Sequence, residues 1–301
     1  SVVPKPLWSR KVTADDQNRI DQATNCVLIQ TNQQKILIET GYGSKLKDKQ
    51  RQFLAAEAGD PLAESLNVFH VKPEEIDLVI LTHLHFDHAG GVTRLNADGE
   101  LELTFPNAEH FVQRGEWDIA TSDIPELRGV YPRENFDLLA DSSQLKLIEG
   151  DVEIVPGIRT VVTGGHTEFH QAIVIEREEQ AFYYLADVCP TSWNLATAWC
   201  AGFDLYQLET RQVKRRLLTE IQERDAWVLF DHDPELAGAK LTVNPRGEFT
   251  VGEQVVITRA ATVFEDGELA DIELNVNVEI KGRMVDDVMV ADKVSFELGG
   301  I

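Results

Sequence analysis

The chain of 301 residues is short of positive charge and of long hydrophobic runs. Its 28 lysines and arginines stand against 51 aspartates and glutamates, which gives a formal net charge of −23. Such an acidic surface repels phosphate backbones and anionic lipids, so we expect no nucleic-acid partner and no membrane partner. No run approaches the roughly 18 apolar residues that a membrane-spanning helix needs.

Cysteine is also scarce: Cys26, Cys189 and Cys200 are too few and too irregularly spaced for a disulfide framework. This usage is typical of a reducing compartment, so we expect a cytoplasmic protein with three buried thiols. Cys189 is a minor candidate for a metal site because it lies close to a candidate ligand, Asp187. The start of the chain lacks the apolar stretch of a secretory signal, but it also lacks Met, so a removed leader stays open.

Hydrophobic patterns predict two groups of strands, each followed by helices, which indicates an α/β protein with two sheets and helices outside them. Residues 1–250 contain no linker rich in Pro, Gly or Ser, so we interpret them as one domain. Strands at 26–30 and 35–39 are predicted to form one hairpin, and residues 171–187 a second hairpin. Further strands are predicted at 74–82, 145–150, 151–163 and 226–233, and helices at 45–58, 107–121 and 209–225.

The last part of the sequence, residues 251–301, has a different pattern. Residues 271–281, DIELNVNVEIK, alternate strictly between apolar and polar, which predicts a half-buried strand. KGRM at 281–284 is predicted to turn this strand toward a second strand that ends near 298. We therefore expect a β-rich C-terminal extension that covers the core or forms a subunit contact, and a homodimer is possible.

Metal-ligand side chains stand where four of the predicted strands end. Five of the eight histidines and two aspartates occupy these places, whereas His70, His110 and His170 lie elsewhere. Strand ends hold loops rigidly at one edge of a sheet, so residues distant in sequence can converge there. The residues at the strand ends are His83, His85, Asp87, His88, His166, Asp187 and His232.

A single histidine at a strand end is most simply interpreted as a hydrogen-bonded polar residue of a loop. Five of the eight histidines at strand ends are difficult to explain in this way. In an extended loop residues i and i+2 project alike, so His83 and His85 can bind one ion. Asp87 and His88 can then turn toward a second ion. Imidazole and carboxylate suit Zn²⁺, and also Fe or Mn when oxygen ligands are added.

The motifs THLHFDHAGG, GGHTEFH, LAD and FDHD resemble, in order and spacing, the metallo-β-lactamase-fold hydrolases over roughly residues 20–245. The resemblance implies an αββα sandwich with two divalent metal ions at the sheet edges. It implies a first metal held by His83, His85 and His166. It implies a second metal held by Asp87, His88 and His232, with Asp187 bridging both and His170 supporting the site from behind.

The same resemblance implies the chemistry of a hydrolase. Two metal ions would share a water and lower its pKa, and the bridging hydroxide would attack the substrate. Asp187 would position this hydroxide, and Asp87 would pass a proton to the leaving oxygen. Glu168 in the GHTEFH motif is interpreted as a solvated loop residue.

Among these hydrolases the chain is most similar to lactonase-like members, including N-acyl homoserine lactonases and pyridoxolactonases. The similarity rests on NCVLIQT, LADVCPTSWNL and FDHDPELAGAKL, while Pro190 replaces a tyrosine that well-known acyl-homoserine lactonases carry. We expect the substrate to be a small ester, and a lactone in particular. The alternatives are a phosphotriesterase or a thioesterase with the same metal centre, and a non-catalytic metal-binding scaffold. Apolar residues that could line the substrate pocket are Leu84, Phe86, Trp193, Leu195, Trp199 and Phe203, and Phe86, Trp193 and Trp199 are the ones we expect there.

Overall fold

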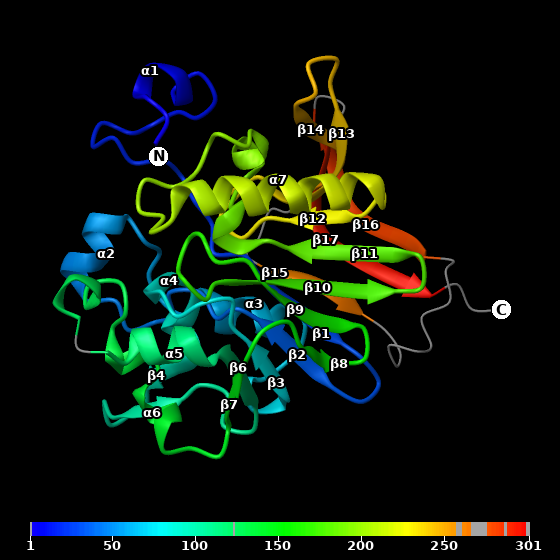
Figure 1. The fold of residues 1–301 in the computed structure, drawn as a ribbon. Helices are drawn as coiled ribbons and strands as arrows, with labels where there is room; N and C mark the ends of the chain where they lie inside the picture. Colours follow the sequence, from blue (N-terminus) through cyan, green and yellow to red (C-terminus); the bar gives the residue numbers. More distant parts are fainter. Residues whose placement is uncertain (1, 123, 257–260, 266–275, 286–287, 299–301) are drawn as a thin grey trace. The chain divides into compact units, whose positions relative to one another are not determined.

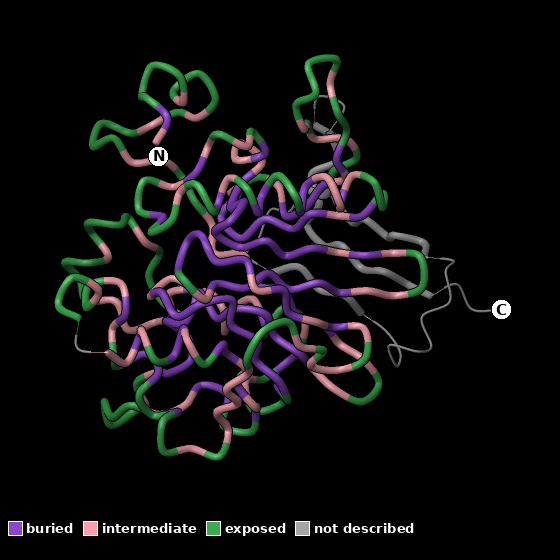
Figure 2. Tube along the Cα trace, viewed as in Figure 1, coloured by how far each residue is buried: buried purple, intermediate pink, exposed green. Residues whose placement is uncertain are grey.

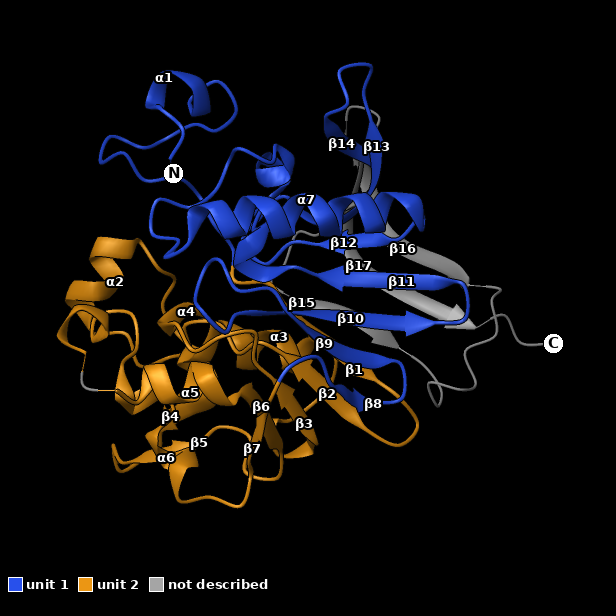
Figure 3. Ribbon diagram, in the orientation of Figure 1, with its two compact units in different colours: residues 1–23, 150–258, 283–291 blue, residues 24–149, 259–282, 292–301 orange. Residues whose placement is uncertain are grey.

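The computed structural model describes residues 2–122, 124–256, 261–265, 276–285 and 288–298. The chain divides into two compact units, which Figure 3 distinguishes by colour. Unit 1 comprises residues 1–23, 150–258 and 283–291, and unit 2 comprises residues 24–149, 259–282 and 292–301. This division interleaves the chain, and it is separate from the predicted boundary between residues 250 and 251, which stays a prediction.

Unit 2 is built on a six-stranded sheet in the order β15-β1-β2-β3-β6-β7. The first two strands in sequence form the expected antiparallel hairpin, and the remaining neighbours pair in parallel. Parallel strands are usually buried on both faces, which explains continuous apolar runs such as Leu78–Ile80. The strands are β1 (Cys26–Gln30), β2 (Lys35–Ile38), β3 (Leu78–Ile80), β6 (Glu109–Gln113), β7 (Leu145–Ile148) and β15 (Ala261–Glu265).

Short helices complete unit 2, and one hydrophobic core unites them with the sheet. Leu37 and Val79 of the strands pack in this core with Trp117 and Phe136. The helices are α2 (Asp48–Leu54), α3 (Pro61–Val68), α4 (Phe86–Ala89), α5 (Arg114–Ala120) and α6 (Asp137–Ala140). Short 3₁₀ helices are η1 (Pro73–Glu75), η2 (Gly90–Val92), η3 (Pro125–Leu127) and η4 (Arg133–Asn135), and β4 (Thr93–Leu95) pairs with β5 (Leu101–Leu103).

Unit 1 is built on a seven-stranded sheet in the order β14-β13-β12-β11-β10-β9-β8. Burial is concentrated along its central strands β10 and β11, which form the predicted hairpin (Figure 2). The strands are β8 (Glu153–Val155), β9 (Ile158–Val162), β10 (Gln171–Arg177), β11 (Gln180–Tyr184), β12 (Trp227–Leu229), β13 (Leu236–Val243) and β14 (Phe249–Val256). The remaining helices are α1 (Lys5–Trp8), α7 (Gln207–Glu223), η5 (Ala186–Val188) and η6 (Ser192–Leu195).

The long helix α7 lies along this sheet (Figure 1), as its sequence predicts. Val213, Leu217 and Ile221 follow each other at intervals of four residues, and all three are buried in the core of unit 1. They share that core with Tyr183 and Val228 of the sheet. The apolar stripe on one side of the helix is therefore what attaches it to the strands.

The predicted helix at residues 107–121 is wrong in its first half. Residues 109–113 form β6, which pairs with β3 and β7, and only residues 114–120 are helical. The strand runs into the helix without a loop, so the two periodicities merge in the sequence. The helix expected at 45–58 is shorter than predicted, because Ala55 takes a left-handed conformation that ends α2.

The C-terminal extension contains two paired strands, β16 (Val276–Val285) and β17 (Val288–Leu298). The prediction of a turn at KGRM is wrong, because these four residues continue β16. Residues 271–275, the first part of the alternating stretch, lie outside the described residues. Within the part of the chain that is described, no helix combines the length and the apolarity needed to cross a membrane.

The three thiols are buried and unpaired by disulfides, as predicted. Burial raises the pKa of Cys189 to about 12, and its Sγ donates a weak hydrogen bond to the carbonyl of Thr191 at 3.9 Å. A thiol held in its protonated form is a poor metal ligand. Cys189 therefore has the environment of a core residue.

One buried histidine makes stability depend on pH. Burial lowers the pKa of His110 to about 4 although Nδ1 donates to the carbonyl of Ala108 at 3.0 Å, and Nε2 has no hydrogen-bond partner among the described residues. The unfolded chain takes up this proton near pH 6.5, whereas the folded chain does so only near 4. Between these values the unfolded state binds more protons, so stability falls as the pH falls.

We expect His110 to account for about 3 kcal/mol of the unfolding free energy lost between pH 6.5 and 4. Denaturant unfolding at a series of pH values measures this loss. His110→Asn removes the titrating ring and should flatten the curve in this window, whereas His70→Asn, at an exposed histidine, should leave it unchanged. Equal slopes in the wild type and in His110→Asn would contradict the assignment.

Candidate metal centre

The histidine-rich motif of unit 2 follows β3 directly and bends into α4. His83, His85 and His88 are all buried. The ring centroid of His83 lies 4.5 Å from that of His85 and 4.1 Å from that of His88. Ligand nitrogens of His83 and His85 approach within 4.8 Å, so these two residues can share one ion, as their spacing predicts.

Neighbouring polar groups hold two of these rings by their Nδ1 atoms. Nδ1 of His83 lies 3.0 Å from Oγ1 of Thr82, and Nδ1 of His88 lies 3.3 Å from Oε2 of the buried Glu39. The other carboxylate oxygen of Glu39 accepts a hydrogen bond from the backbone N–H of Thr82 at 2.7 Å. With Nδ1 occupied in this way, Nε2 is the nitrogen of each ring that could bind a metal ion.

A second buried carboxylate, Glu116 of α5, supports the middle of the motif. It accepts hydrogen bonds from the backbone N–H of Leu84 at 3.0 Å and from the hydroxyl of Tyr131 at 2.9 Å. The ring of Tyr131 in turn lies 4.9 Å from the ring of His85. Glu116 and Tyr131 therefore fix the loop on which the paired histidines stand.

The two glycines that end the motif allow it to lie against the loop after β2. A Cβ atom on Gly90 would stand 2.4 Å from the carbonyl oxygen of Tyr42, and one on Gly91 would stand 2.2 Å from that of Thr40. The backbone N–H of Thr40 donates to the carbonyl of His88 at 2.9 Å. Only glycine fits such close backbone contacts.

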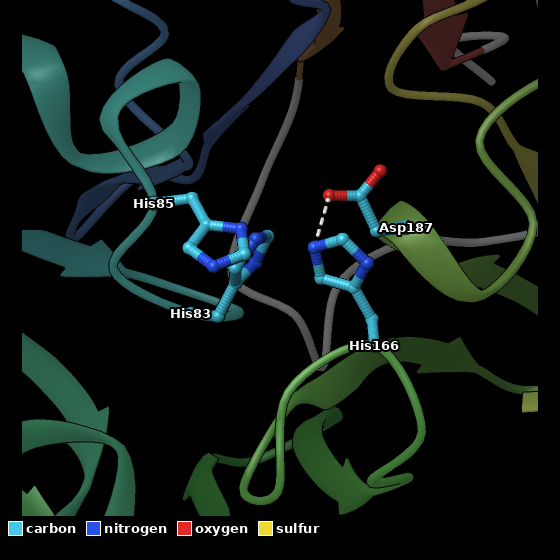
Figure 4. Close-up of side chains that lie close together, drawn as sticks. All are labelled: His83, His85, His166 and Asp187. Carbon is cyan, nitrogen blue, oxygen red and sulfur yellow. Dashed lines mark ion pairs between the residues drawn. The ribbon is translucent and has the colours of Figure 1, made fainter. Parts of the chain in front are cut away.

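In unit 1, His166 and Asp187 form a buried ion pair. Nε2 of His166 lies 3.0 Å from Oδ2 of Asp187, and its Nδ1 lies 2.9 Å from Oδ1 of the buried Asp204. Figure 4 shows this pair with its dashed line, and also the side chains of His83 and His85 of unit 2. Asp204 orients the ring so that Nε2 faces Asp187.

These contacts determine the charges of the pair. Burial alone would lower the pKa of His166, but the carboxylates of Asp187 and Asp204 raise it to about 9. Burial alone would raise the pKa of Asp187, but His166 and His232 lower it well below its ordinary value. Asp187 is therefore a carboxylate at neutral pH, the form that binds metal.

His232 follows β12 and faces the same aspartate. Its Nδ1 lies 2.7 Å from the carbonyl oxygen of Ala23, and its Nε2 lies 3.4 Å from Oδ1 of Asp187 and 3.3 Å from Oδ2 of Asp231. Ligand atoms of Asp187, Asp231 and His232 all lie within 4.8 Å of one another.

The remaining predicted residues have varied surroundings. Asp87 is partly exposed, and its Oδ1 lies 3.9 Å from Nε2 of His88. The ring of His170 packs edge-on against that of His166 at 5.8 Å, and its Nδ1 lies 2.6 Å from Oγ1 of Thr163. Trp193 and Trp199 are half-buried in unit 1, and Glu168 is exposed, as predicted.

A cavity of about 180 Å³ in unit 2 contains Phe86 in its wall. Its wall also includes the apolar side chains of Leu46, Phe53 and Leu54 and the polar side chains of Gln50, Glu134 and Asn135. One cation, Lys45, also lines it; burial lowers the pKa of this amine to about 8, and Nζ donates to the carbonyls of Gly90 and Thr93. Of the pocket candidates from the sequence, Leu84 and Leu195 instead belong to the hydrophobic cores.

Comparison with known families matches residues 19–241 to the metallo-β-lactamase superfamily. The chain belongs to this superfamily. The predicted fold class, α/β with the metallo-β-lactamase fold, is thereby confirmed, and the chain is a hydrolase of this fold. Residues 241–295 match a second family, a domain of unknown function called DUF5666.

Individual relatives agree with this placement. An N-acyl homoserine lactonase of Bacillus cereus is 31% identical over 222 residues, which cover 70% of this chain and 81% of that protein. The crystal structure of a probable metal-dependent hydrolase from Staphylococcus aureus is 30% identical, with a TM-score of 0.74 over 85% of this chain and 91% of its own. AidC, a dizinc quorum-quenching lactonase, shares the fold at 21% identity, with a TM-score of 0.62 over 76% of this chain and 78% of its own.

The donor set of each unit fits a metal ion on its own chemistry. Imidazole and carboxylate are the ligands that divalent zinc, iron and manganese accept in proteins. Asp187 and Asp231 are both buried with ligand atoms within 4.8 Å of each other, and a bound cation would offset their repulsion. These clusters agree with the metal dependence of the family.

Four carboxylates beside the candidate ligands were missed by the sequence analysis: Glu39, Glu116, Asp204 and Asp231. Three of them lie far along the chain from the residues that they support, and no local spacing marks them. Asp231 adjoins His232 in the FDHD motif and was the one with a visible signal.

Asp204 offers a direct test of this support. We expect Asp204→Asn to weaken metal binding about 10- to 100-fold, because His166 loses the carboxylate that orients it. Titration of the metal-free protein with Zn²⁺ in competition with a chelator measures the change. Asp225→Asn removes the same charge from an exposed residue and should bind as the wild type does; equal affinities in both variants would refute the role of Asp204.

Proposed function

We propose that the protein is a binuclear metal-dependent hydrolase that opens a lactone ring. The observation that carries this proposal is the set of oriented, buried histidines and aspartates in a chain whose relatives include N-acyl homoserine lactonases. A relative that is 31% identical to this chain is an N-acyl homoserine lactonase, so a lactone is the proposed substrate.

The first metal ion would be held by His83, His85 and His166, and the second by Asp87, His88 and His232. Asp187 would bridge the two. Contacts within each unit support this division: His83 and His85 pair in unit 2, while Asp187 faces both His166 and His232 in unit 1. When bound, the two cations would lower the pKa of a shared water and polarise the ester carbonyl.

Asp187 and Asp87 would have different roles in lactone hydrolysis. Asp187 is buried and held as a carboxylate, so it binds and orients without exchanging a proton. Asp87 is more exposed than the other predicted ligands, which gives its second oxygen access to a substrate. It would accept the proton that the attacking water loses and pass it to the leaving alkoxide oxygen as the ring opens.

Two observations support a lactone as the substrate: the relatives include lactonases, and unit 2 contains a cavity partly lined by apolar side chains. An acyl homoserine lactone combines a polar ring with an apolar chain, and the cavity in unit 2 combines Phe86 of the motif with exposed apolar side chains such as Phe53 and Leu54. Phe86 is the predicted pocket residue for which this cavity gives support. The roles of Trp193 and Trp199, and the possible homodimer, remain predictions.

Ring opening of a lactone releases a proton, so a pH-stat measures it directly. We expect metal-loaded protein to release acid rapidly from an N-acyl homoserine lactone, and a chelated sample to release almost none. If both metal ions are bound and no acid is released, the proposed lactonase activity is wrong. Phosphotriesters and thioesters, assayed in parallel, would identify the alternative esterases, and inactivity on all three classes would indicate a non-catalytic scaffold.

Asp87→Asn tests whether the centre is catalytic. We expect kcat to fall about 100-fold or more, because a positioned general acid contributes at least this factor. Glu168→Gln is the matched control: it neutralises an exposed carboxylate close to another ligand and should retain full activity. Metal content is measured for both variants, so that loss of turnover can be separated from loss of metal. An unchanged kcat in Asp87→Asn would contradict the proposed role of Asp87 in proton transfer.

Phe53→Ala tests the proposed acyl-chain cavity. Losing an apolar contact of this size costs about 1–2 kcal/mol, so we expect KM to rise about 10-fold for a long-chain lactone and little for a short-chain one. Steady-state kinetics on the two substrates measure the difference. Val243→Ala, at an exposed apolar residue of β13, is the control. An equal effect of Phe53→Ala on both chain lengths would argue against this cavity.

A further inference from the structure

We propose that Asp231 is itself a metal ligand, at the ion held by His232 and Asp187, which makes this position rich in oxygen donors. The inference rests on the proposed function and extends its ligand set by a residue of the FDHD motif to which the resemblance gave no role.

The chain bends at Asp231 and His232. In a straight strand two neighbouring side chains point to opposite faces. Here the bend brings Oδ2 of Asp231 to 3.3 Å from Nε2 of His232, and both side chains are buried. The two residues therefore converge on one point, although they are adjacent in sequence.

The hydrogen bond on the far side of the His232 ring defines which nitrogen faces this point. The carbonyl oxygen of Ala23 can only accept, so Nδ1 of His232 carries the hydrogen that it donates over 2.7 Å. In the neutral ring Nε2 then presents a lone pair. That lone pair faces Oδ1 of Asp187 at 3.4 Å and Oδ2 of Asp231 at 3.3 Å.

Three electron-pair donors thus meet in one buried place. The ligand oxygens of Asp187 and Asp231 lie within 4.8 Å of each other, so the two carboxylates repel. Burial removes most of the water that would screen this repulsion. Protonation of His232 supplies a single positive charge against two negative charges. A divalent cation balances both carboxylates and accepts the lone pair of the neutral imidazole, so it fits this arrangement better.

The neighbouring Asp233 shows what a structural carboxylate looks like in the same loop. Its Oδ2 accepts hydrogen bonds from the backbone N–H and the hydroxyl of Ser192, and its Oδ1 accepts from the backbone N–H groups of Glu235 and Leu236. Asp233 therefore shapes the loop. Asp231 faces a histidine and a second carboxylate, as a ligand would.

The extra oxygen donor has a consequence for metal choice. A first ion held by His83, His85, His166 and the bridging Asp187 would meet mainly nitrogen, which suits zinc. The ion at Asp187, Asp231 and His232 would meet mainly oxygen, which raises the relative affinity for Mn²⁺ or Fe²⁺. We infer a centre whose two positions differ in metal preference.

The experiment is a metal titration of the full chain, stripped of metal and then given Zn²⁺, Mn²⁺ or Co²⁺. Metal content per chain is measured by elemental analysis after desalting, and the visible absorption of bound Co²⁺ reports the coordination number. We expect Asp231→Asn to lose about 10-fold or more in affinity for one of two ions, to lose more for Mn²⁺ than for Zn²⁺, and to change the Co²⁺ spectrum.

Two further variants keep the test decisive. Asp231→Ser removes the carboxylate without adding volume and replaces Asp231→Asn if that variant fails to fold, as judged by circular dichroism. Asp225→Asn removes one exposed negative charge and should bind both ions as the wild type does.

The outcomes separate the two proposals. Two ions in the wild type, with unchanged affinities and an unchanged Co²⁺ spectrum in the Asp231 variants, would overturn the role of Asp231 and leave the proposed hydrolase intact. A wild type that binds no divalent ion under any condition would overturn the metal-dependent function itself, and the inference with it. Selective loss of one ion in the Asp231 variants would support both.

Discussion

The burial of charged and titratable groups at the ends of strands is the constraint on which this structure depends. A buried imidazole or carboxylate is expensive unless a partner satisfies it. Here each candidate histidine with a defined Nδ1 contact has a different partner: Thr82 for His83, Glu39 for His88, Asp204 for His166 and the carbonyl of Ala23 for His232. These contacts orient the histidine rings. They also stabilise the segments that carry the histidines, which are loops except at α4.

The supporting groups come from several elements, and this ties the candidate site to the folding of each unit. Glu116 belongs to α5, and Glu39 follows β2 with a positive φ of 66°. A non-glycine residue in this conformation is uncommon and is sustained only where the surroundings require it. Hydrogen bonding of Glu39 to Thr82 and its contact with His88 provide such a requirement.

The sequence was sufficient for the elements that are encoded locally and for the local groups of ligand-type side chains. The β1–β2 hairpin, the β10–β11 hairpin and α7 were predicted, since turn residues and apolar spacing fall within one short window. The paired histidines were predicted for the same reason. The strand–helix junction at Gln113 was misread because no turn residue separates β6 from α5.

The supporting carboxylates could not be predicted in this way. Asp204 is 38 residues from His166, and Glu39 is 43 residues from Thr82, so their contacts exist only after the strands have paired. With 51 acidic residues in the chain, no single carboxylate stands out by its type. Burial distinguishes them, and burial is a property of the tertiary structure.

The acidity of the whole chain bears on which esters suit such a centre. A net charge of −23 attracts divalent cations over distances of about a Debye length and repels anionic substrates. Glutathione thioesters and nucleic acids carry negative charge, so they would approach against this field. A lactone with an uncharged acyl chain meets no such barrier. We therefore expect the same negative field of the chain to attract metal ions and to favour a neutral substrate.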